Sequence, residues 1–457
     1  MQTPTFTPTT FDVDIWESRW KVVKTTMDHM LTTMEKRGET VRQKTLQSAL
    51  TALKAFGESQ ISFFLTGFGP GARVFLEPST QYPPDYVLRI TLDQITHDMN
   101  VIVRAWEQRL PDSTSPAMLK TLAQADILAS NALAPAIQQE LLEPATVVTY
   151  FQKDTNVRII PYAPVSFIGL PITCQTVKRD LLAIPHEVGH YVYRYGRVRS
   201  GKNEGSRFAA ALTQRYGHQT TWRQAWMEEI FADVYGGLIG GPVMALGFED
   251  ILSGAPRADF IHDDGEHPVP ALRLQIYQAV FEVMKVPDAV LKALAKRSDD
   301  WQADYGKPTS FTTANGETID LAQAQREIKE IVESMLANEL ADLRKTEAWT
   351  GKANGKNGLA GLHKQFEELV EATPTNGATP VADLQMPDPQ SLSLQSPQNA
   401  WQGKSVKRKL GDTELWGDLI KAATKEQQHI ILPPSVWMAL LDGSGWATEG
   451  PGGANTH

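Results

Sequence analysis

The 457-residue chain contains a single cysteine, Cys174, and only 10 histidines. One cysteine excludes an internal disulfide and a cysteine-rich zinc finger, and it fits a reducing compartment. We expect Cys174 to be a packing residue rather than a nucleophile.

Long apolar runs are also missing. No stretch of about 18 uninterrupted apolar residues occurs, so the sequence predicts no integral membrane segment. Residues 1–8 have neither the basic nor the apolar region of a standard secretory signal. The cytoplasm is therefore the expected location, with export by another route left open.

Positive charge is in deficit. The chain has 44 lysines and arginines against 53 acidic residues, with a net charge of −9 and a pI near 5.7. This balance argues against a nucleic-acid-binding protein, and the isolated basic run at 404–409 is interpreted as part of a solvated linker. With 42% hydrophobic residues, the chain can bury a large core and form two or three domains.

Two of the scarce histidines, His186 and His190, lie one helical turn apart with Glu187 between them, in the pattern H-E-x-x-H. An i, i+4 pair projects from one helix face, so both imidazoles can reach one zinc ion while Glu187 serves as general base toward an activated water. Gly189, between the histidines, leaves room for close packing or for substrate approach. The pattern predicts a catalytic Zn²⁺ site.

A second acidic segment supplies the remaining ligand. Glu229 and Asp233 are also one turn apart, and a catalytic zinc needs three protein ligands and an open position. We predict Glu229 as the third ligand and Asp233 as the carboxylate that orients a histidine. Glu228 is the competing ligand; we prefer Glu229 because its spacing places it on one face with Asp233, so that Glu228 points elsewhere.

These motifs resemble the gluzincin metallopeptidases, in which H-E-x-x-H is followed by E-x-x-x-D on a second helix. A third segment, from His267 to Arg273, resembles the H-P-x-x-x-x-R segment of the Ste24/HtpX group. The resemblance covers about residues 145–285. It implies that His267 and Arg273 lie beside the zinc and stabilise the tetrahedral intermediate. Tyr191, Tyr193 and Tyr235 are lesser candidates for that role.

Local patterns place the motifs on elements. Short strands are expected at Thr146–Phe151, Val157–Tyr162 and Val165–Leu170, and the prolines around the last one predict a sheet edge, which could be ordinary or could pair with an extended peptide. The helix that carries His186 begins either near Asp180 or at Pro185. Ile61–Thr66 is a candidate strand.

The expected fold is α+β. It has a zincin-like metallopeptidase domain, with a small mixed sheet over the active-site helix, a largely helical N-terminal lobe and a helical C-terminal region. The predicted division is 1–144 for the lobe, 145–345 for the catalytic domain, 346–410 for a helix and Pro/Gln-rich linker, and 411–457 for a small C-terminal segment. That last segment could contact a partner or act as an autoinhibitory appendage.

The predicted activity is zinc-dependent hydrolysis of peptide bonds in a peptide or protein substrate. The alternatives are a non-catalytic binding or scaffold protein with a zincin fold, and a zinc hydrolase acting on a non-peptide amide. Specificity and the choice between endo- and exopeptidase depend on pockets that the sequence does not reveal.

Overall fold

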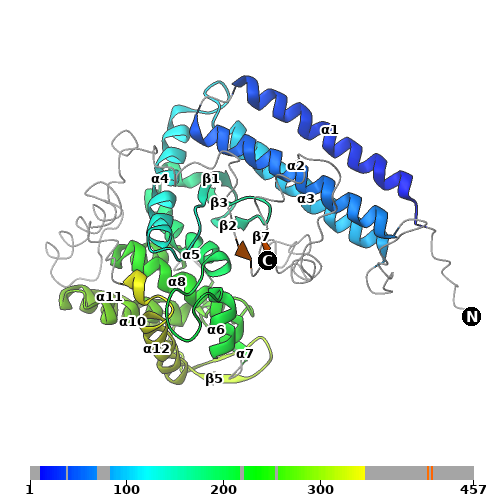
Figure 1. The fold of residues 1–457 in the computed structure, drawn as a ribbon. Coiled ribbons are helices and arrows are strands. Elements are labelled where there is room, and N and C mark those ends of the chain that lie inside the picture. Colours follow the sequence, from blue (N-terminus) through cyan, green and yellow to red (C-terminus); the bar gives the residue numbers. More distant parts are fainter. Residues whose placement is uncertain are drawn as a thin grey trace, which may run out of the picture. The chain divides into compact units, whose positions relative to one another are not determined.

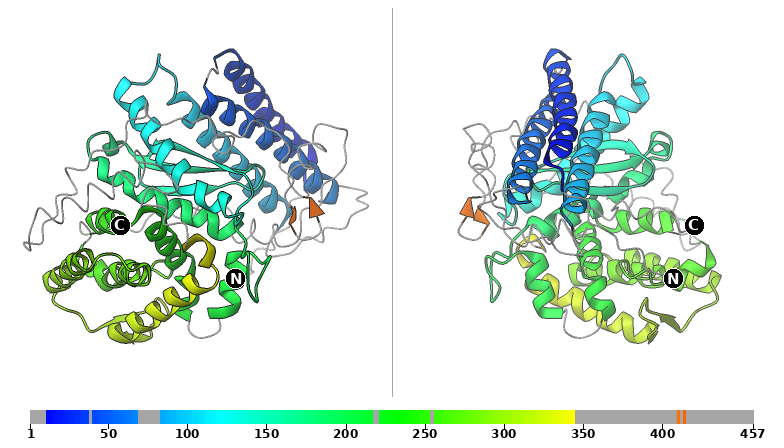
Figure 2. Two further views of the ribbon diagram at one scale, coloured as in Figure 1. Left: turned by 60° about the vertical axis from the view of Figure 1, so that its left-hand side comes forward. Right: turned by 90° about the vertical axis from the view of Figure 1, so that its right-hand side faces the viewer.

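The computed structural model describes residues 11–37, 40–68, 83–216, 221–252, 256–344, 409–410 and 413–414. Within these residues the chain is mostly helical with small β-sheets (Figures 1 and 2), which confirms the mixed α and β character. None of the helices in this part of the chain is long and apolar enough to cross a membrane. The chain divides into two compact units: the first holds residues 1–113, 158–165 and 400–457, and the second holds 114–157 and 166–399.

Three long helices form most of the described part of the first unit: α1 (Val13–Arg37), α2 (Val41–Phe68) and α3 (Pro84–Glu107). The indole of Trp16 on α1 donates a hydrogen bond to Asp85 on α3, at 2.7 Å. The strand predicted at Ile61–Thr66 is wrong, because α2 continues through it to Phe68. A short apolar run fits a buried helix as well as a strand, and here it extends the buried face of α2.

A buried ion pair fixes segment 158–165 within the first unit. Arg158 contacts Asp98 on α3, and Tyr162 donates a hydrogen bond to the other carboxylate oxygen of Asp98 at 3.1 Å. All three side chains are buried. Because an unpaired buried charge is costly, this contact holds the segment against α3.

The second unit contains helix α4 (Pro116–Gln138). The main sheet has three strands: β1 (Thr146–Gln152), β2 (Asn156–Ile159) and β3 (Val165–Pro171). Their order in the sheet is β1-β3-β2. Asp126 on α4 accepts hydrogen bonds from the backbone N–H and hydroxyl of Thr149 on β1. The expectation that β3 lies at a sheet edge is wrong, since it is the central strand. Pro164 precedes this strand and Pro171 ends it, so neither removes a donor from its interior.

The remaining elements follow in chain order. They are η1 (Ile172–Gln175), η2 (Lys178–Ala183), α5 (Ile184–Tyr195), α6 (Phe208–Tyr216), α7 (Thr221–Ala225), α8 (Met227–Gly240), α9 (Pro242–Leu252), η3 (Arg257–Ile261), α10 (Pro270–Met284), α11 (Asp288–Asp304), β4 (Ser310–Thr312), β5 (Thr318–Asp320), α12 (Leu321–Ala337), α13 (Ala341–Arg344), β6 (Lys409–Leu410) and β7 (Thr413–Glu414). Strands β4 and β5 pair antiparallel, as do β6 and β7. Most of the predicted linker and C-terminal segment lies outside the described residues, and the predicted domain boundaries and the partner contact of that segment stay predictions.

Candidate metal centre

Helix α5 carries the H-E-x-x-H motif and begins at Ile184, directly after the 3-10 helix η2. Pro185 therefore lies in the first turn, where its missing N–H has no helical acceptor to lose. This decides between the two starts left open by the sequence: the α-helix does not begin near Asp180. His186, Glu187 and His190 are all buried.

Helices α5 and α8 pack against each other through small residues. A β-carbon on Gly189 would lie 2.8 Å from Cα of Ala232, and one on Gly236 would lie 3.3 Å from Cα of His186. Both glycines therefore let the two backbones approach closely. This close approach brings the carboxylates of α8 to the histidines of α5.

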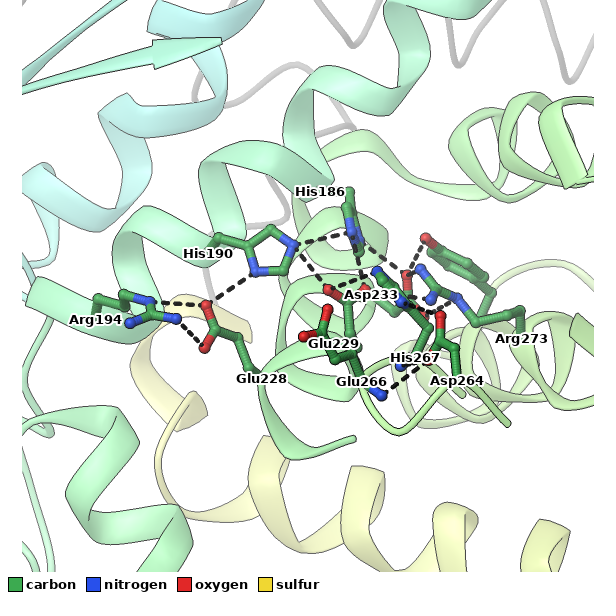
Figure 3. Close-up of polar contacts among 11 residues, drawn as sticks. His186, His190, Arg194, Glu228, Glu229, Asp233, Asp264, Glu266, His267 and Arg273 are labelled. Atoms are coloured by element: carbon green, nitrogen blue, oxygen red, sulfur yellow. Dashed lines mark hydrogen bonds and ion pairs between the residues drawn. The ribbon is translucent and has the colours of Figure 1, made fainter. Parts of the chain in front are cut away.

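The two histidines and Glu229 form a buried cluster whose ligand atoms all lie within 4.8 Å of one another. The Nε2 atoms of His186 and His190 are 3.2 Å apart. Glu229 places Oε2 3.4 Å from Nε2 of His186 and Oε1 3.3 Å from Nε2 of His190. Figure 3 shows all three side chains directed toward one point.

Each of these separations is close to that of two donor atoms on one tetrahedral metal ion, and the two contacts of Glu229 come from its two different oxygens. Ligand atoms about 2.0–2.1 Å from zinc at tetrahedral angles lie about 3.3 Å from one another. The two Nε2 atoms, 3.2 Å apart, need a proton or a metal ion between them, because two lone pairs facing each other at this distance would repel. Chemistry and spacing of this donor set thus fit a metal, and the predicted ligands are the three residues that the structure brings together.

Asp233 lies beside His186, on the side of the ring away from His190. Its Oδ1 is 3.0 Å from Nδ1 of His186, and it accepts hydrogen bonds from Tyr277 at 2.8 Å and from Arg273 at 3.0 Å. Arg273 also donates to Glu229, at 3.2 Å. The Arg273 side chain is only 4% exposed. Its guanidinium thus contacts Glu229 of the cluster and Asp233 beside it.

Glu228 points away from the space between the two Nε2 atoms, but it contacts His190 of the cluster. Its Oε1 lies 3.2 Å from Nδ1 of His190. Arg194, one turn after His190 on α5, donates two hydrogen bonds of 2.9 Å to the two oxygens of Glu228. Figure 3 shows His190, Glu228 and Arg194 in a row beside the cluster.

His267 approaches from the loop before α10. Its Nδ1 lies 2.8 Å from Oδ2 of Asp264, and its Nε2 lies 3.6 Å from Oε1 of Glu229. The side chain is 45% exposed, far more than those of the three clustered residues. The structure thus brings His267 to the rim of the cluster, where a ligand could reach it.

The electrostatics of the cluster favour a cation. Burial by itself lowers the pKa of His186, but contacts with Asp233 and Glu229 outweigh burial and raise this pKa to about 10. Burial raises the pKa of Glu229, yet the charges of His190, His186 and Arg273 hold it well below its ordinary value. The carboxylates therefore attract positive charge to the space between the Nε2 atoms.

The three candidate tyrosines are core residues in this structure. Tyr191 and Tyr235 are fully buried and Tyr193 is nearly so. The hydroxyl of Tyr235 donates to the backbone oxygen of Ala132 on α4, at 2.7 Å. The hydroxyl proton of Tyr235 is therefore already donated within the core. Cys174 is buried, as expected of a packing residue.

Sequence reasoning missed Arg194, Tyr277 and Asp264. Arg194 follows His190 by four residues, and Tyr277 follows Arg273 by four, so helical spacing could have indicated both. Asp264 lies in a loop, where no periodicity points to it. In comparisons with protein-family models, with curated proteins and with solved structures, nothing matches this chain.

Proposed function

We propose that this chain is a zinc-dependent metallopeptidase of the gluzincin type. The observation that carries the proposal is the meeting of two helices: His186 and His190 on α5, which also holds Glu187, lie with Glu229 of α8 in donor contacts of 3.2, 3.3 and 3.4 Å. A structural zinc site is usually closed by four protein ligands, whereas three ligands leave a position for water and substrate.

A zinc ion held by the three ligands would supply a Lewis acid that polarises the scissile carbonyl and makes the attacking water more acidic. Glu187 would accept the proton of that water and return it to the leaving amine. His267, exposed at the rim, would donate a hydrogen bond to the oxygen that gains negative charge.

Arg273 has a different part in this proposal from the one that the resemblance implies. It is buried and hydrogen-bonded to Glu229 and Asp233. We therefore assign it to holding these carboxylates in place, and not to contact with the substrate. Asp233 in turn fixes the ring of His186 with Nε2 free for the metal.

The test compares wild type with Glu187→Gln and His190→Ala. Zinc is quantified by elemental mass spectrometry, and hydrolysis of a quenched fluorescent peptide library is followed in the same samples. We expect about one zinc per chain in wild type and in Glu187→Gln, with activity of Glu187→Gln reduced about 10²–10⁴-fold, and loss of both zinc and activity in His190→Ala.

Glu204→Gln is the matched control, because Glu204 is an exposed glutamate in the loop between α5 and α6. It should keep both zinc and activity. Wild type that binds no zinc on reconstitution contradicts the proposal and favours a scaffold protein. Zinc binding without peptide cleavage, but with cleavage of small amides, would favour the non-peptide hydrolase.

A further inference from the structure

The two nitrogens of His190 are contacted by two successive residues of α8. Glu229 lies 3.3 Å from Nε2, on the side of the metal cluster, and Glu228 lies 3.2 Å from Nδ1, on the opposite side of the ring. Successive helix residues rarely serve one partner, because they point about 100° apart. Here the imidazole of His190 lies between the two carboxylates, and each of its ring nitrogens contacts one of them.

Arg194 fixes the second of these carboxylates. Its Nε donates to Oε1 of Glu228 and its Nη2 to Oε2, each at 2.9 Å. Paired hydrogen bonds of this kind fix the plane of a carboxylate as well as its position. Because Arg194 and His190 are on the same helix, one turn apart, the orientation of Glu228 is set relative to the ring that it contacts.

We propose that Glu228 and Arg194 form a positioning pair that holds His190 with its Nε2 toward the metal. The inference rests on the metal-binding part of the proposed function and does not depend on peptidase activity. A carboxylate at Nδ1 keeps the ring proton there, leaves the Nε2 lone pair for the metal and makes the ring a better ligand. The hydrogen bonds from Arg194 also hold the Glu228 oxygens away from the cluster, so Glu229 remains the carboxylate between the two Nε2 atoms.

The cluster thus has two histidine–carboxylate pairs with different surroundings. Asp233, which orients His186, is fully buried, whereas the side chains of Glu228 and Arg194 are 25% and 34% exposed. Substitutions at Asp233 are therefore expected to destabilise the core. Substitutions at Glu228 and Arg194 test metal positioning with less damage to the fold.

The experiment measures zinc affinity by competition with a chelator, and the visible absorption spectrum of the Co²⁺-loaded protein. Glu228→Gln and Glu228→Ala should weaken zinc binding about 10–100-fold, and Arg194→Ala should weaken it in the same direction by less. Arg194→Lys keeps the charge but loses the paired geometry, so its affinity should lie between those of wild type and Arg194→Ala. The Co²⁺ absorption bands should shift in each Glu228 variant.

Glu327→Gln is the matched control. Glu327 accepts from Arg223 in another partly buried arginine–glutamate pair, at 3.0 Å, on helices α12 and α7. Its loss should leave zinc affinity and the Co²⁺ spectrum unchanged. Thermal unfolding of each metal-free variant checks that the fold is intact.

Each result bears on the inference separately from catalysis. If wild type binds zinc without cleaving peptides, the peptidase proposal is contradicted. The inference about Glu228 still holds in that case if the Glu228 variants bind zinc more weakly than wild type. Zinc affinities of the Glu228 variants within twofold of wild type, with an unchanged Co²⁺ spectrum, overturn the inference alone. Wild type that binds neither metal overturns both.

Discussion

A β-carbon added to Gly189 would lie 2.8 Å from Cα of Ala232, closer than such atoms approach in folded proteins. The two residues are on α5 and α8, the helices that supply His186, His190 and Glu229 of the cluster. Backbone cannot move aside as the end of a side chain can, so this contact sets the distance between the helices.

Gly189→Ala should therefore lower the free energy of unfolding by about 1–3 kcal/mol, although alanine favours the helix by about 1 kcal/mol. It should also weaken zinc binding, because the helices must separate. Chemical denaturation and chelator competition measure the two effects. Gly237→Ala on α8 is the control: its nearest contact would be 3.3 Å, to the ring of Tyr277, and its unfolding free energy should change by less than about 1 kcal/mol.

Arg273 joins two buried carboxylates, and its removal should strongly destabilise the metal-free protein. Arg273→Ala leaves Asp233 and Glu229 without their cation, which should cost about 3–5 kcal/mol in urea unfolding. Tyr277→Phe removes one hydrogen bond to Asp233 and should cost about 1 kcal/mol. Equal losses in the two variants would show that the charge of Arg273 is not what stabilises this region.

Asp263 anchors the loop that presents His267. This buried carboxylate accepts hydrogen bonds from the indole of Trp226 at 3.0 Å and from the backbone N–H groups of Gly265 and Ala314, both at 2.9 Å. Asp263→Ala leaves these donors without an acceptor and should lower the unfolding free energy by about 2–3 kcal/mol. The exposed Asp299→Ala is the control and should have little effect. An equally small effect of Asp263→Ala would contradict the anchoring role.

His97 gives the first unit a pH-dependent stability. Burial, together with the charges of Arg158 and Arg104, lowers the pKa of His97 from 6.5 to about 4. Between these two pH values the unfolded chain binds a proton that the folded chain does not, so stability should rise as the pH increases from 4 to 6.5. Because His97 is only partly buried and solvent still reaches it, screening should limit the effect to less than about 1 kcal/mol.

The measurement is the difference in unfolding free energy between wild type and His97→Gln at several pH values. It should change across this window and be constant above it. A difference that is flat with pH would mean that His97 titrates alike in the folded and unfolded chains.

Much of the candidate site follows from local sequence. The i, i+4 spacings of His186 with His190, and of Glu229 with Asp233, are properties of any α-helix, and both segments are helical. The preference for Glu229 over Glu228 also followed from spacing alone, and in the structure Glu229 is the residue within the cluster.

Contacts between different helices and strands could not be predicted from the local sequence. Glu228 was expected only to point away, because nothing in its own helix indicates that it meets His190 and Arg194. The strand predicted at Ile61–Thr66 failed for a similar reason: a short apolar run does not reveal whether a helix or a sheet will bury it. The central position of β3 depends on pairing with two strands, and prolines at its ends did not prevent it.

The sequence by itself thus determined which side chains share a helix face, because backbone geometry fixes that spacing within one turn. Only the tertiary structure decided which faces meet. The contact of Gly189 with Ala232 brings α5 and α8 together, the loop anchored by Asp263 delivers His267, and α10 places Arg273 behind the carboxylates. These relations depend on packing between distant segments, where burial and the pairing of charges outweigh local preference.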